Sequence, residues 1–336
     1  MKIKYLGHAG FLIESRENIL LMDPWLSPNG AFLKSWYQFP RNHHLFDIIN
    51  DKFSSSIKNK YIYISHDHND HFDKHFLNSI NNKDFTFIIP NYKSKIFERD
   101  IKNIESKNII ICNDFDDKII GDISFSIFID DSGINRDSGI LLSTGGKVFL
   151  NLNDCKVYDR INDLLKYGQI DFCTAQFSGA TWYPICYDFV EQDIKNKITI
   201  NKKNNKFNLL IDFLENISPI AFIPSAGPPC FLSNSLININ FEEPNQFPRK
   251  NEFIEKLKQK ISYDLEIISM EPGYEYKDEI RKIDKDIIKH KTYKNYIKEY
   301  STYHVPNNKN DIYDFDDIFS KLEILNKKKN NGFRKI

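Results

Sequence analysis

The strongest chemical signal in the sequence is a short polar stretch, Ser65-His66-Asp67-His68-Asn69-Asp70-His71, which holds three of the nine histidines. It follows an apolar segment, Tyr61–Ser65, whose pattern predicts a buried β-strand. A tight loop at the end of a strand can direct His66 and His68 toward one metal ion. Asp70 and His71 can then reach a second ion a few ångströms away. Since imidazole and carboxylate ligands suit zinc, iron or manganese, the stretch predicts a site for two divalent metal ions.

Alternating strands and helices surround this stretch and must position it. Short strands are expected at Lys2–Leu6, Phe11–Ser15 and Ile19–Met22, and strand–helix alternation continues from Tyr61 to Cys112. β-like segments then run from Ile123 to Leu152, and helices and strands alternate again as far as Pro224. This order predicts a mixed α/β architecture in which helices cover packed sheets.

The composition excludes several classes of protein. The chain has 336 residues, 41% of them apolar, so it can build a core and is not a disordered chain. Lys and Arg number 46, as do Asp and Glu, which argues against a dedicated nucleic-acid binder. No apolar run approaches the roughly 20 residues of a membrane span. With no leader-like start and five cysteines without a Cys-x-x-Cys pair, we expect a cytoplasmic protein with reduced thiols.

The histidine stretch has the His-x-His-x-Asp-His pattern of the metallo-β-lactamase superfamily, and the chain resembles that superfamily. More closely, it resembles the metal-binding domain of CMP-N-acetylneuraminate hydroxylase and its bacterial relatives. The similar segments, in chain order, are Tyr5-Leu6-Gly7-His8-Ala9, Met22-Asp23-Pro24-Trp25-Leu26, Tyr61–His71, Phe125–Cys155, Phe177-Ser178-Gly179-Ala180 and Pro224-Ser225-Ala226-Gly227. The resemblance covers roughly residues 3–235.

The resemblance implies a fold and a bridging ligand. The fold would be an αβ/βα sandwich of two mixed β-sheets flanked by helices. Asp154, which follows the predicted strand Val148–Leu152, would bridge both metal ions. We assign residues 1–270 to this domain, and residues 271–336 to a C-terminal extension packed on it.

Two departures from the superfamily concern the ligands. Its hydrolases add one histidine before the bridging aspartate and another near the end of the domain. Here the only histidine between Asp73 and Asp154 is the badly placed His75, and Ser225-Ala226-Gly227 stands at the later position. Asp130, Asp131 or Asp137 could supply a replacement oxygen ligand, with Asp131 and Asp137 preferred. His8 and Asp67 are expected to be catalytic, and His304 is a weaker candidate for the pocket.

A third departure concerns the source of electrons for an oxygenase. The animal hydroxylase carries an iron–sulfur domain, whereas this sequence has no Cys-x-His…Cys-x-x-His pattern. An oxygenase built on this chain would therefore need a reductant, which could be a separate electron-transfer protein.

Two functions remain open at this stage. The first is an iron-dependent oxygenase that hydroxylates or oxidises a small polar metabolite such as a sugar nucleotide, and we prefer it. It fits a ligand set of histidines and carboxylates with open positions. The second is a zinc- or manganese-dependent hydrolase of a phosphoester, lactone or amide, in which the metal lowers the pKa of bound water to about 7.

Overall fold

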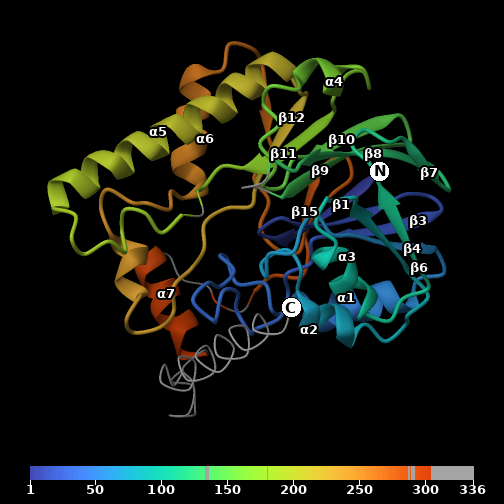
Figure 1. Cartoon of the computed structure of the whole chain (residues 1–336), viewed down its shortest axis with the longest axis horizontal. Coiled ribbons are helices and arrows are strands. Elements are labelled where there is room, and N and C mark those ends of the chain that lie inside the picture. The colour runs from blue at the N-terminus through green and yellow to red at the C-terminus, as the bar shows by residue number, and fades with distance from the viewer. Residues whose placement is uncertain (133–135, 180, 287, 289–291, 304–336) are drawn as a thin grey trace, which may run out of the picture.

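Two β-sheets packed face to face form the centre of the molecule, and helices cover their outer faces (Figure 1). The structure is a computed structural model and describes residues 1–132, 136–179, 181–286, 288 and 292–303. The candidate pocket residue His304 and the rest of the expected C-terminal extension after it lie outside the described residues. No helix of the described part is both long and apolar enough to cross a bilayer.

The first sheet has eight strands in the order β15-β14-β1-β2-β3-β4-β5-β6. Pairing is antiparallel from β15 to β3 and parallel from β3 to β6. Its strands are β1 Lys2–Gly7, β2 Gly10–Glu14, β3 Asn18–Met22, β4 Asn59–Tyr63, β5 Thr86–Pro90, β6 Asn108–Cys112, β14 Tyr274–Tyr276 and β15 Ile280–Lys282. The pairing of β14 with β1 places a segment from late in the chain beside its first strand.

The second sheet has seven strands in the order β13-β12-β11-β10-β9-β8-β7. Pairing is antiparallel from β7 to β10 and parallel from β10 to β13. Its strands are β7 Lys118–Ile120, β8 Ile123–Asp130, β9 Asp137–Thr144, β10 Lys147–Asn151, β11 Phe172–Gln176, β12 Ala221–Ser225 and β13 Glu266–Ile267.

Three layers of apolar side chains hold the sandwich together. The layer between the sheets includes Phe11 and Met22 from the first sheet and Ile140 and Phe149 from the second. A second layer lies between the first sheet and helices α1 Leu45–Ser55, α2 Lys74–Ser79 and α3 Ile96–Lys102. A third lies between the second sheet and helices α4 Ile161–Leu165, α5 Gln192–Ile217 and α6 Lys250–Lys260. A 3-10 helix, Ile237–Phe241, and helix α7 Tyr293–Thr302 pack together in a smaller cluster.

The predicted αβ/βα sandwich of two mixed sheets is confirmed, and most strands lie within two residues of their expected positions. Parallel pairing is nearly as extensive as antiparallel pairing. Helix α1 was not expected, because the region from residue 26 to 58 read as irregular. Leu45, Ile49 and Phe53 recur at helical spacing and are fully buried, but His44 provides no side-chain cap to mark the start of the helix. The division of the chain at residue 270 stays a prediction.

Candidate metal centre

The candidate centre lies where parallel strands of both sheets end. In the first sheet, Asp23 follows β3 and the stretch from His66 to His71 follows β4. In the second sheet, Asp154 follows β10, the neighbour of the parallel strand β11. Because the carboxyl ends of parallel strands meet at one edge of a sheet, loops far apart in the sequence converge here.

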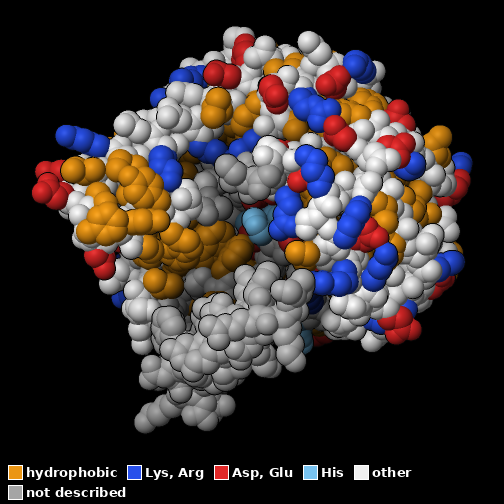
Figure 2. All heavy atoms as spheres, viewed as in Figure 1, with side chains coloured by type: hydrophobic (Ala, Val, Ile, Leu, Met, Phe, Trp, Pro, Cys, Tyr) orange, Lys and Arg blue, Asp and Glu red, His pale blue; other side chains and the backbone are white. Residues whose placement is uncertain are grey.

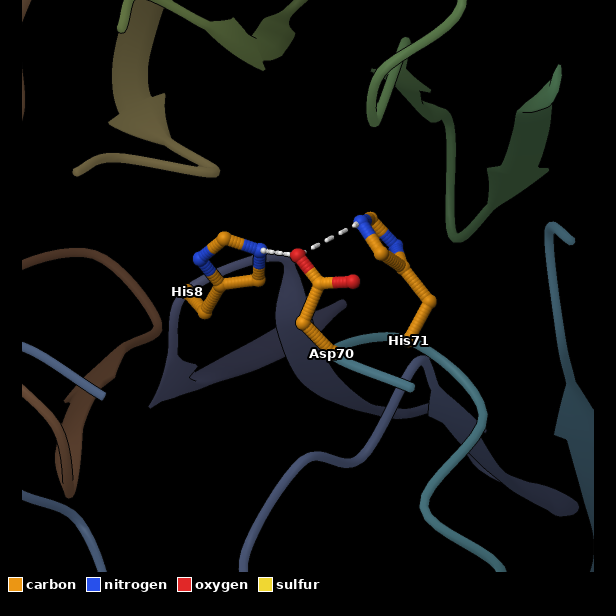
Figure 3. A group of neighbouring side chains, drawn as sticks. All are labelled: His8, Asp70 and His71. Atoms are coloured by element: carbon orange, nitrogen blue, oxygen red, sulfur yellow. Dashed lines mark ion pairs between the residues drawn. The ribbon is translucent and has the colours of Figure 1, made fainter. Parts of the chain in front are cut away.

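A first group of possible ligands consists of His8, Asp70 and His71, all buried (Figure 3). The Asp70 carboxylate lies between the two imidazoles. Its Oδ2 atom is 3.1 Å from Nε2 of His8 and 4.0 Å from Nε2 of His71. His8 occupies the turn between β1 and β2 with φ of 49°. Its Nδ1 lies 3.1 Å from the carbonyl oxygen of Gly227 and donates to it, which leaves the Nε2 lone pair facing Asp70.

A second group consists of His66, His71 and Asp154. Nε2 of His71 lies 3.6 Å from Oδ1 of Asp154. Nε2 of His66 lies 2.9 Å from Nδ1 of His68 and 3.7 Å from Oδ1 of Asp137. His66 and His68 lie at hydrogen-bond distance from each other, whereas the two carboxylates stand 3.6 and 3.7 Å from the nearest imidazole nitrogens, beyond hydrogen-bond distance.

Asp23 fixes the orientation of the histidine that both groups share. Its Oδ2 atom accepts a hydrogen bond from Nδ1 of His71 at 2.7 Å, and its Oδ1 accepts from the backbone N–H of Ser65 at 2.8 Å. Asp23 and His71 are both fully buried. With Nδ1 acting as the donor, Nε2 of His71 is left to bind a metal ion, as in the carboxylate–histidine–metal arrangement of many metalloproteins.

Several buried polar atoms at this point have no hydrogen-bond partner among the described residues. They are Nε2 of His8, Oδ1 of Asp70, Nε2 of His71 and Oδ1 of Asp154. Unsatisfied buried atoms are costly, and converging imidazole nitrogens and carboxylate oxygens are the ligands of a divalent cation. The residues present therefore fit the two metal ions that the motif implies.

Electrostatics support the same conclusion. Burial alone would raise the pKa of Asp70, but the nearby His71 and His8 hold it at about 2. Burial would lower the pKa of His71, but Asp154, Asp70 and Asp23 raise it well above its usual value. For Asp137, burial and then the negative charge of Asp154 raise the pKa to about 6. The cluster thus carries a concentration of negative charge that a cation would neutralise.

A cavity of about 510 Å³ opens onto the cluster. Figure 2 shows this hollow, with a histidine side chain inside it and Lys and Arg side chains nearby. The lining comprises Phe32, Trp36, His68, Asp70, Asp137, Asp154, Lys156, Gln176, Gly179, Thr181, Trp182, Lys202, Lys203, Lys206, Gln246 and Pro248. A substrate in this cavity could contact both the candidate metal ligands and a wall of lysines and aromatic rings.

Two of the expected site residues are not brought to the cluster. The carboxylate of Asp131, just beyond the end of β8, accepts a hydrogen bond from the backbone N–H of Lys93 at 2.8 Å. Asp67, between His66 and His68 in the chain, forms an ion pair with Arg136 at 3.2 Å. Neither residue lines the cavity, so the expected ligand role of Asp131 and the expected catalytic role of Asp67 have no support in this geometry.

The remaining expected residues do converge: His8, His66, His68, Asp70, His71, Asp137 and Asp154. Sequence reasoning gave His8 a catalytic role, and the structure places it beside Asp70 in a group that could hold a metal ion. It missed Asp23 as a support for His71, although Asp23 follows a predicted strand in the same way as the histidine stretch. It also missed the lysines of α5, which lie more than 130 residues from the motif.

Comparisons with known proteins agree with this fold. Residues 2–131 match the family model described as a β-lactamase superfamily domain. A Mycolicibacterium smegmatis protein named as a Rieske 2Fe-2S iron–sulfur protein is 33% identical over 269 residues, covering 77% of this chain and 50% of that protein. A similarly named Mycobacterium tuberculosis protein is 28% identical over 268 residues, with the same coverage of each chain. The chain therefore spans about half the length of these curated relatives.

Solved structures show the same architecture. Igni18, a metallo hydrolase from Ignicoccus hospitalis, aligns with a TM-score of 0.51 at 13% identity, covering 83% of this chain and 99% of that chain. CmlA, a diiron β-hydroxylase from Streptomyces venezuelae, aligns with a TM-score of 0.50 at 14% identity, covering 80% and 52%. At these identities the likeness concerns the fold, which both a hydrolase and a hydroxylase share.

Proposed function

We propose that this chain, which has the metallo-β-lactamase fold and a β-lactamase superfamily domain, is a dinuclear iron oxygenase acting on a small polar molecule. The observation that carries the proposal is the composition of the cluster. Its candidate ligands are four histidines and three aspartates, and none of them is a thiolate: His8, His66, His68, Asp70, His71, Asp137 and Asp154. An open site of imidazoles and carboxylates is the kind that serves oxygen chemistry at iron.

The candidate ligands can be divided between two ions by assigning each imidazole nitrogen to a single ion. Nδ1 of His71 is engaged by Asp23, so its Nε2 serves a single ion, which we assign together with Asp70 and His8. His66, His68 and Asp137 would hold the other ion. Asp154 lies within reach of both His71 and His66 and would bridge the two ions.

The protein residues would orient the metals and the substrate. Bound iron would supply the activation of oxygen, which no side chain of this chain can perform. Asp23 holds His71 in one tautomer, the Gly227 carbonyl does the same for His8, and the apolar rings of the cavity limit access of water.

An electron source would be needed, and a separate electron-transfer protein is our proposed partner. Two curated relatives are named as Rieske 2Fe-2S proteins, and this chain covers only half of each. In those proteins, sequence outside the matched region is long enough to hold a further domain. Their names and lengths support an electron-transfer step.

Hydrolysis by zinc or manganese is the second candidate. It is favoured by the fold shared with Igni18, which is named a metallo hydrolase, and by the ability of zinc to produce a bound hydroxide near neutral pH. The same seven ligands could hold zinc, so the geometry alone supports both chemistries.

Metal content and oxygen use separate the two. Protein produced in iron-replete cells and purified without oxygen is expected to carry close to two iron ions per chain. With a chemical reductant and a mixture of small metabolites, it should consume oxygen, measured with an oxygen electrode, and the Asp154→Ala variant should not. Two zinc ions per chain from iron-rich medium, with turnover unchanged under strict anaerobiosis, would establish the hydrolase instead.

A further inference from the structure

Part of the cavity wall is rich in lysine. Helix α5 supplies Lys202, Lys203 and Lys206, and the loop after β10 supplies Lys156. All four line the same cavity as the candidate ligands His68 and Asp154.

Two of these lysines already have strong partners. Lys203 forms an ion pair with Glu252 and donates a hydrogen bond to Asn245. Lys202 donates to the backbone carbonyl of Tyr183 at 2.7 Å. Lys203 therefore has a counter-charge within the protein, whereas Lys202 is held by a neutral oxygen.

Lys206 and Lys156 differ from Lys203 in having no carboxylate partner among the described residues. Lys206 donates to Oε1 of Gln176 at 2.6 Å, a neutral acceptor, and no carboxylate of the described residues lies within ion-pair distance of it. Lys156 is exposed to the cavity and has no ion-pair partner in the described part of the chain. An ammonium group with little access to water and no counter-charge, as at Lys206, is unfavourable unless a ligand supplies one. The exposed Lys156 adds a second positive charge to the same cavity.

The charged groups around Lys206 also indicate that this part of the cavity would favour an anion. On its own helix lie Lys202 and Lys203, and across the cavity lie Lys156, Asp137 and Asp154. Burial, followed by the positive charge of Lys156, lowers the pKa of Lys206 to about 7. In the proposed enzyme the negative charge of the two aspartates would be taken up by divalent ions, so the lysine charges would lack compensation until an anion arrives.

The aromatic wall suggests what accompanies the anion. Trp36 and Trp182 have ring centroids 5.9 Å apart, and Phe32 packs against Trp36 at 4.8 Å and against His68 at 5.8 Å. The rings are tilted to one another, by 53° for Trp36 and Trp182 and by 69° for Phe32 and Trp36, and they form an apolar wall against which a ring of a ligand could pack edge to face.

We propose that Lys206 and Lys156 form an anion subsite that binds the carboxylate or phosphate group of the substrate, while a planar part of the substrate lies against Trp36 and Trp182. The substrate class is therefore a small organic anion with an unsaturated or aromatic portion. The inference rests on the proposed function only in taking this cavity as the active site, since the lysines can bind an anion whichever metal is present.

The test is binding of phenyl phosphate to protein freed of metal by a chelator and dialysed, and to the same protein loaded with zinc. Two of the three tryptophans of the chain line the cavity, so quenching of tryptophan fluorescence reports the binding directly. We expect saturable quenching, competition by inorganic phosphate, and at least roughly tenfold weaker binding for Lys206→Gln and Lys156→Gln. Lys197→Gln is the matched control, because Lys197 is an exposed lysine of the same helix that does not line the cavity.

Phenol and benzoate complete the design. Phenol should bind far more weakly than phenyl phosphate, and the ratio of benzoate to phenyl phosphate affinity distinguishes a carboxylate subsite from a phosphate subsite. Equal binding of phenol, or unchanged phenyl phosphate binding in both lysine variants, would overturn the proposal. So would loss of metal from Lys206→Gln with unchanged phenyl phosphate affinity, because Lys206 would then serve as a counter-charge for the aspartates. None of these measurements depends on turnover. The subsite proposal can therefore be refuted while the oxygenase proposal stands, and the oxygenase proposal can be refuted while the subsite proposal stands.

Discussion

Nδ1 of His71 lies 2.7 Å from Oδ2 of Asp23, and both side chains are fully buried. The two residues are 48 positions apart in the sequence and meet because β3 and β4, which precede them, are parallel neighbours in the first sheet. The contact leaves Nε2 of His71 directed at Asp154 and Asp70. Strand pairing thus sets the orientation of a candidate ligand that contacts both groups of the cluster.

Replacement of Asp23 by alanine should weaken metal binding without removing a ligand. The imidazole of His71 would lose its fixed tautomer, and we expect metal affinity to fall roughly 10- to 100-fold. Competition with a chromophoric chelator measures the affinity, with Asp84→Ala as control because Asp84 lies at the surface paired with Lys107. An Asp23→Ala protein that keeps its circular dichroism spectrum and wild-type metal affinity would show that the contact is only structural.

Asp154 and Asp131 should behave in opposite ways when each is changed to alanine. Asp154 reaches both histidine groups, so its loss should remove most of both ions. Asp131 bonds to the backbone of Lys93 outside the cavity, so its loss should leave the metal content near that of the wild type. Elemental analysis of both purified variants decides the assignment. Full occupancy in Asp154→Ala would mean that another residue bridges the ions.

The loss of metal expected for Asp137→Ala lies between the losses expected for Asp154→Ala and Asp131→Ala. It approaches His66 but not the group of His8 and Asp70, so Asp137→Ala should lose mainly the ion that His66 holds. About one equivalent of metal should remain, as measured by titration under the same conditions. Complete loss or complete retention of metal would contradict the division of ligands between the two ions.

The histidine motif and the strand before it predicted that His66, His68, Asp70 and His71 lie together, and the family resemblance implied the sandwich and added Asp154 to this group. These residues follow directly after strands, and the ends of strands are where the sequence pattern is most informative. The role of His8 was harder to predict, because the turn between β1 and β2 reaches the cluster only through sheet pairing. Asp131 was preferred over Asp130 without knowledge of where β8 ends, and its backbone contact with Lys93 depends on tertiary structure. The lysines of α5 carry no motif, and only the packing of that helix on the second sheet brings them to the cavity.

Gly139 gives a prediction about the core beneath the site. A Cβ atom at this position would lie 2.2 Å from the ring of Phe128 and 2.7 Å from the carbonyl oxygen of Asn151. Gly139→Ala should therefore lower the free energy of unfolding by roughly 1–3 kcal/mol through overpacking. In a double-mutant cycle with Phe128→Leu, measured by urea denaturation, the second change should recover part of that loss. Additive effects would show that the ring does not limit space at Gly139.

Lys206 gives the last prediction, on the pH dependence of stability. Its pKa in the folded protein is about 7, below the 10.5 of a free lysine, so between these pH values the unfolded chain binds more protons. Stability should therefore rise with pH across this window, and the cost of a charged Lys206 is present in full only below about pH 7.

Replacement of Lys206 by methionine removes that cost. In chelator-containing zwitterionic buffers without phosphate, Lys206→Met should melt a few degrees above the wild type at pH 6, and the difference should shrink toward pH 10. Lys197→Met should show no such pH-dependent gap, and a constant difference for Lys206→Met across the range would mean that the ammonium is well solvated in the folded protein.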